Sequence, residues 1–75
     1  MTRYVNTDHP GYQHGVDLAN LSLDNPSALG VSTVELLRMA ELAADEAHLK
    51  EDTSGYHVYR GLANTLQDYL NDQAT

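Results

Sequence analysis

Two amphipathic stretches in the second half of the chain, separated by a short polar break, constrain the fold most. Ser32 and Glu35 have the Ser-x-x-Glu spacing of a capping box, in which each side chain accepts a hydrogen bond from a backbone N–H group at a helix start. We therefore predict a helix over residues 33–50. Apolar residues at helical spacing predict a second helix over residues 56–71. Their short connection predicts an antiparallel hairpin.

Each predicted helix has one apolar face that is expected to form the core. On the first helix this face is rich in alanine, which allows a neighbouring helix to approach closely. Core or dimer contacts are expected at Leu36, Leu37, Ala40 and Ala44 on the first helix and at Tyr59, Leu62, Leu66 and Tyr69 on the second.

The first helix also carries a second apolar stripe, formed by Met39, Leu42 and Leu49, roughly opposite its core face. In a two-helix hairpin each helix has only one neighbour, so nothing would cover this second stripe. Three interpretations are open: it packs beneath the N-terminal segment, it forms a homodimer seam, or it binds another protein. If it binds another protein, contacts are expected at Met39, Leu42, Leu49, Tyr56, Asp45 and Glu46.

Residues 1–31 differ from the hairpin at residues 32–75, because they hold both prolines and three of the five glycines. We predict an extended arm with local turns. Residues 16–21 suit either a short strand or one helical turn. Asn25 followed by Pro26 is a start signal for a single helical turn.

The predicted fold is all-α, and its small core favours association. Of the thirteen side chains on the two main faces, only eight are larger than alanine. A chain of 75 residues is near the size at which a single core becomes marginal. We therefore expect two hairpins to pair as a homodimeric four-helix bundle.

Composition excludes several classes of function. The formal net charge is −7, from 4 Lys and Arg against 11 Asp and Glu, which disfavours direct binding to nucleic acid or to anionic membranes. No stretch is long and apolar enough to span a membrane, and the absence of cysteine fits the cytoplasm. None of the four histidines has the i, i+4 spacing of metal ligands, and no nucleophile motif occurs. We expect no metal, no cofactor and no catalytic residue.

Acidic residues gather near the end of the first predicted helix. They are Glu41, Asp45, Glu46, Glu51 and Asp52. Such a patch either keeps the surface solvated, docks a protein with a basic or apolar groove, or imitates the phosphates of a nucleic acid. The last possibility predicts an inhibitor of nucleic-acid-binding proteins.

Residues 28–34 resemble the turn of a helix-turn-helix transcriptional regulator. Two observations oppose DNA binding. Pro26 leaves only about one helical turn before this segment, whereas the motif needs two packed helices. Arg38 is the only cation early in the following helix, next to Glu35 and Glu41.

Residues 36–43 and 61–66 carry a wider resemblance. With the acidic charge and the turn-rich arm, they resemble small helical-hairpin accessory proteins encoded by phages or pseudomonads, a class that includes anti-activators of transcription factors and anti-CRISPR proteins. The resemblance implies a non-enzymatic inhibitor that binds a host regulatory protein stoichiometrically, and it assigns no functional residue.

Overall fold

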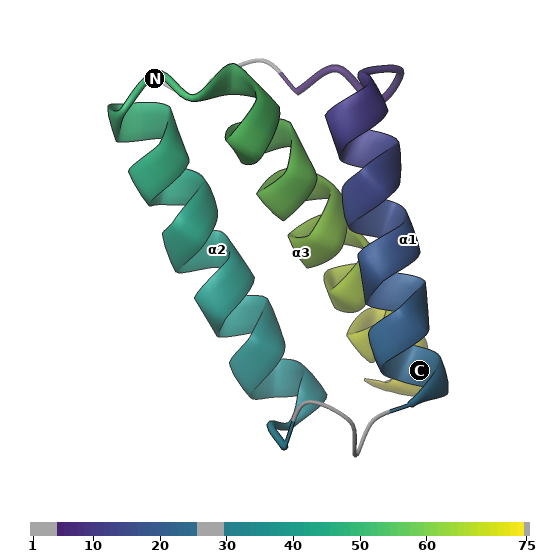
Figure 1. The fold of residues 1–75 in the computed structure, drawn as a ribbon. Coiled ribbons are helices and arrows are strands. Elements are labelled where there is room, and N and C mark those ends of the chain that lie inside the picture. The colour runs from purple at the N-terminus through teal and green to yellow at the C-terminus, as the bar shows by residue number, and fades with distance from the viewer. Residues whose placement is uncertain (1–4, 26–29, 75) are drawn as a thin grey trace.

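The computed structural model describes residues 5–25 and 30–74, which form three helices and no strand. They are α1 (Pro10–Asp24), α2 (Thr33–Leu49) and α3 (Thr53–Ala74). Each helix runs opposite to the one before it, so α1 and α3 are parallel (Figure 1). Because α3 packs against both α1 and α2, it is the central helix. The all-α prediction is confirmed, but the fold has three helices and not the predicted two, because α1 packs on the antiparallel pair of α2 and α3.

The third helix is α1, and it occupies most of the segment for which an extended arm was predicted. His9 is its N-cap residue and Pro10 stands in the first turn, where a missing N–H group costs nothing. The extended arm is therefore wrong for residues 10–24, and so is a strand at residues 16–21. The single turn expected after Asn25 lies at residues 26–29, outside the described residues.

Glycine in α1 serves close helix packing rather than chain reversal. Gly11, Gly15 and Ala19 recur every four residues and therefore share one face of the helix. A Cβ atom at Gly15 would overlap the carbonyl oxygen of Val58 and come 2.7 Å from a second backbone atom of α3. A Cβ atom at Gly61 of α3 would overlap the carbonyl oxygen of Tyr12. The backbones of α1 and α3 thus touch directly.

Local signals determine how α2 begins and ends. The Ser32 hydroxyl accepts a hydrogen bond from the Glu35 N–H group at 3.1 Å, as the capping box predicts. After Leu49 the chain reverses through Glu51, whose φ of 59° lies in the left-handed region. The Asp52 N–H group donates to the Ala47 carbonyl, which completes a Schellman motif.

The start of α3 also differs from the prediction. The Asp52 carboxylate accepts a hydrogen bond from the Gly55 N–H group at 3.0 Å, so Asp52 caps the helix. As a result α3 begins at Thr53. It ends at Ala74, so it is longer at both ends than the predicted residues 56–71.

The core consists mostly of small side chains. One cluster joins all three helices through Ala19, Leu37, Ala40, Ala63 and Leu66, and Leu36 and Leu62 pack against it. A second cluster joins α2 and α3 through Ala44, Ala47 and Tyr56. Among the described residues, Leu66 is the largest fully buried side chain.

Tyr59 and Tyr69, expected in core or dimer contacts, are 37% and 40% exposed and do not belong to the core, whereas a role in dimer contacts stays a prediction. The reason is that α3 is buried on two faces, one against α1 and one against α2. Helical spacing of apolar residues therefore does not show which side chains of α3 are buried.

The homodimer was suggested by the small core of two helices. Within one chain, α1 adds to this core because it covers the second face of α3. The homodimeric four-helix bundle stays a prediction, now without that support. Within the described ranges, no helix is long and apolar enough to cross a membrane.

The close contact between α1 and α3 predicts that alanine in place of Gly15 lowers the stability of the chain. At an open helical position, Gly→Ala stabilises a protein by about 1 kcal/mol. We expect Gly15→Ala to destabilise this chain by about 2 kcal/mol instead, because the added methyl group overlaps the α3 backbone. Urea unfolding followed by circular dichroism measures the change. Asn20→Ala, at an exposed α1 position, should cost nothing. A stabilising Gly15→Ala would contradict the close approach.

In the turn between α2 and α3, substitution by glycine is predicted to stabilise the chain. Glu51→Gly should raise the free energy of unfolding by about 1 kcal/mol, because glycine adopts a positive φ without steric cost. Glu51→Ala removes the same charge but keeps the Cβ atom, so it should gain much less in the same urea titration. Equal gains from both variants would attribute the effect to charge.

Candidate functional site

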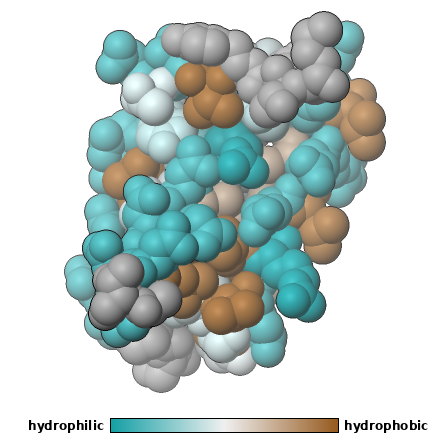
Figure 2. Space-filling model, turned by 180° about the vertical axis from the view of Figure 1, so that it is seen from behind, coloured by the Kyte–Doolittle hydropathy of each residue, from teal (hydrophilic) through white to brown (hydrophobic). Residues whose placement is uncertain are grey.

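The outward face of α2, formed by Met39, Leu42 and Leu49, is the main exposed apolar feature of that helix. These side chains are 55%, 64% and 82% exposed. The opposite side of α2 packs its alanines and Leu37 into the core. The described part of the N-terminal segment, residues 5–25, therefore does not cover this stripe. Figure 2 shows the molecule from behind, where apolar groups stand apart among hydrophilic ones.

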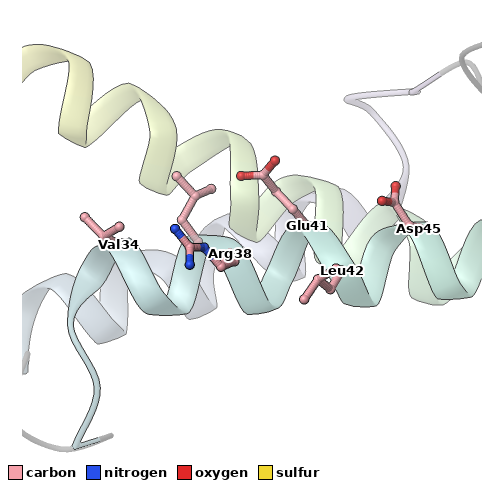
Figure 3. Close-up of a pocket in the computed structure, with 6 residues that line it drawn as sticks. Val34, Arg38, Glu41, Leu42 and Asp45 are labelled. Carbon is pink, nitrogen blue, oxygen red and sulfur yellow. The ribbon is translucent and has the colours of Figure 1, made fainter.

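A shallow hollow runs along α2 beside this face. Its lining residues are Val34, Leu37, Arg38, Glu41, Leu42 and Asp45, all from α2. In Figure 3, Val34, Glu41 and Asp45 project from one side of the helix, whereas Leu42 projects from the other. A hollow built by a single helix is open to solvent and does not enclose a small molecule, unlike a typical ligand pocket. Its geometry suits contact with another macromolecule.

Charge around the outward face is mainly negative. Glu41, Asp45 and Glu46 are exposed, with Arg38 as the cation among them. Lys50 donates a hydrogen bond to Glu46 at 2.7 Å. This hydrogen bond, together with the opposite charge, lowers the pKa of Glu46 and raises that of Lys50. Both side chains are exposed, so solvent screens the pair and its contribution to stability is small.

Tyr56 was predicted to contact a partner, and this prediction is wrong. The side chain is only 6% exposed and packs with Ala44 and Ala47 between α2 and α3. Because α3 begins three residues earlier than predicted, at Thr53, Tyr56 lies within the helix and faces α2. The remaining predicted contacts, Asp45, Glu46 and the outward face, do lie together on α2.

A histidine cluster at the N-terminal end of α3 was not predicted from the sequence. His57 is only 4% exposed, and its ring stacks on that of His9 with centroids 4.2 Å apart. Tyr56 lies edge-on to His57, and His48 lies against Tyr56. Only the tertiary fold brings these residues together, since their spacing along the chain matches no motif. Over residues 5–25 and 30–74, no group of three or more potential ligands is placed to hold a metal ion.

The structure does not support the helix-turn-helix alternative. Residues 28 and 29 of the proposed turn lie outside the described part of the chain. The connection from α1 to α2 spans residues 25–32, longer than the turn of about 3–4 residues that the motif uses. The helices it joins run antiparallel (Figure 1).

Comparison of the chain with protein families, with curated proteins and with solved structures finds no match. The resemblance to small accessory proteins therefore stays a prediction, and the candidate site is argued from geometry and charge alone.

The burial of Tyr56 predicts a clear effect on stability. Tyr56→Ala should lower the free energy of unfolding by about 3 kcal/mol, because it empties a site in the interface between α2 and α3. Tyr69→Ala removes the same groups from a side chain that is 40% exposed, so its cost should be clearly smaller. Chemical denaturation measures both. Equal, small losses would show that Tyr56 is a surface residue.

Proposed function

We propose that this protein is a small non-enzymatic binding protein that modulates another protein stoichiometrically through the outward face of α2. The observation that carries the proposal is the exposure of Met39, Leu42 and Leu49 on a helix whose opposite side is fully packed. Apolar side chains that gather on one exposed face are a common feature of protein-binding surfaces. The face is also rigid, because α2 is capped at its start and anchored along its length.

The surrounding charges favour a particular class of partner. Glu41, Asp45 and Glu46 flank the apolar side chains, and the whole chain has a formal net charge of −7. A partner helix or groove with apolar positions bordered by lysine or arginine would match both properties. The resemblance to phage and pseudomonad accessory proteins suggests that this partner is a host regulatory protein, such as a transcription factor.

Two other interpretations make different predictions. A second copy of the chain could cover the same face, although pairing two strongly acidic surfaces is electrostatically unfavourable. An acidic mimic of nucleic acid would use the carboxylates more than the leucines. Its binding would weaken steeply with salt, whereas an apolar contact is much less sensitive.

The test is a matched pair of substitutions. Leu42→Glu and Leu21→Glu change side chains of almost equal exposure, 64% on α2 and 63% on α1. We expect Leu42→Glu to abolish capture of the partner protein from host lysate, because it places a charge in the apolar contact, while Leu21→Glu leaves capture intact. Mass spectrometry of the captured proteins at low and high salt gives the result.

Circular dichroism and light scattering serve as controls. Both variants should keep the helix content and melting behaviour of the original chain, since exposed substitutions change stability by about 0.5 kcal/mol or less. If Leu42→Glu and Leu21→Glu capture the same proteins, the outward face of α2 is not the contact. If light scattering shows a dimer that only Leu42→Glu dissociates, the occupant is a second copy.

A further inference from the structure

The N-terminal strap, residues 5–9, crosses the end of the bundle from α1 toward the turn between α2 and α3 (Figure 1). Val5 packs against the cluster of Ala44, Ala47 and Tyr56. The Asn6 N–H group donates a hydrogen bond to Nε2 of His57 at 3.1 Å. The strap is therefore attached by an apolar contact of Val5, a hydrogen bond from Asn6 to His57, and the stacking of His9 on His57.

The hydrogen bonds of His57 determine which form of its ring fits. Nδ1 lies 2.8 Å from the carbonyl oxygen of Thr53, which can only accept, so Nδ1 carries the proton. Nε2 must then be the bare nitrogen that accepts from Asn6. A protonated ring would direct a second N–H group at the Asn6 N–H group, and burial leaves no solvent to relieve this clash of donors.

His9 has the same requirement. Its Nδ1 accepts a hydrogen bond from the Gly11 N–H group at 2.9 Å, and this contact caps α1. Protonation of Nδ1 would remove the cap. The two rings are stacked, with centroids 4.2 Å apart and planes within 11°. If both were protonated, two positive charges would face each other at that separation.

The neighbouring ionisable groups do not supply a compensating contact. Among the described residues they include Asp8 on the strap, His48 on α2, and Tyr56 and Arg60 on α3. Asp52, before α3, accepts a hydrogen bond from the Gly55 N–H group. Asp8 is exposed to solvent, and Arg60 donates to Asn64 and carries the wrong charge. His48 has a buried Nδ1 without a hydrogen-bond partner in the described structure, so its protonation would add charge to the same region.

We propose that His9 and His57 form a proton-sensitive latch, which holds the strap when both rings are neutral and releases it when they are protonated. Protonation of the rings would remove the acceptors of the Asn6 and Gly11 amides, so acid is expected to open the latch. Release would uncover the surface of Ala44, Ala47 and Tyr56 that Val5 covers. The helices are held by the separate α1–α3 and α2–α3 contacts and would stay folded. This proposal does not depend on the proposed binding function.

Hydrogen exchange of the full chain, measured by NMR, tests the latch. After correction for the intrinsic exchange rate, protection of the Asn6 and Gly11 amides should fall by about tenfold from pH 7.5 to pH 5, the effect expected from losing a hydrogen bond of each amide. Protection of the Ala44 and Leu66 amides, inside α2 and α3, should change much less. The nitrogen chemical shifts of His57 should show a proton on Nδ1 at pH 7.5.

Three variants separate the two rings from a general effect of acid. His9→Asn keeps a capping acceptor that does not titrate, so Gly11 protection should become independent of pH while Asn6 protection still falls. In His57→Gln, Asn6 protection should lose its dependence on pH. His14→Asn changes an exposed histidine and should respond like the original chain.

The proposal is overturned if the Asn6 and Gly11 amides keep their protection at pH 5, or if His57 carries its proton on Nε2. It is also overturned if Gly11 protection in His9→Asn falls as it does in the original chain. Should His57→Gln fail to fold, the exchange of the original chain and of His9→Asn still decides.

Discussion

Direct contact between the backbones of α1 and α3 is the constraint on which the rest of the fold depends. Gly15 and Gly61 lie where a side chain of either helix would strike a carbonyl group of the other. Close approach lets a chain with few bulky side chains build a core mainly from alanine, with Leu66 as its largest fully buried member among the described residues. Dispersion contacts between closely spaced helices take the place of large apolar side chains. One chain can therefore complete a three-helix core that two helices could not.

The central position of α3 determines which surfaces remain for function. Because α1 and α2 pack on α3 and not extensively on each other, α2 is an edge helix with one buried and one free side. Its buried side is rich in alanine, and its free side carries Met39, Leu42 and Leu49 within an acidic surround. The same arrangement places the N-cap of α1 beside the N-terminal end of α3, where the ring of His9 stacks on that of His57. The proposed binding surface and the proposed latch thus follow from one packing order, yet they use different residues.

The chain combines an acidic exterior with a buried polar contact that depends on neutral rings. Most of its charge lies on exposed side chains, where solvent weakens each interaction. His57 is different, because burial leaves it only the partners that the fold provides. The stacked rings of His9 and His57 therefore form the proposed latch at this end of the bundle.

The sequence by itself determined the features that depend on local interactions. Ser32 and Glu35 predicted the start of α2, and helical periodicity predicted that Met39, Leu42 and Leu49 lie opposite its core face. It did not predict α1, because glycine disfavours a helix locally, and only contact with α3 turns the small size of Gly15 into an advantage. It also misplaced Tyr56, Tyr59 and Tyr69 and missed the burial of His57. Those outcomes depend on which sides of α3 its two neighbours occupy, and residues distant in the chain decide this, since periodicity identifies an apolar face but not the helix that covers it.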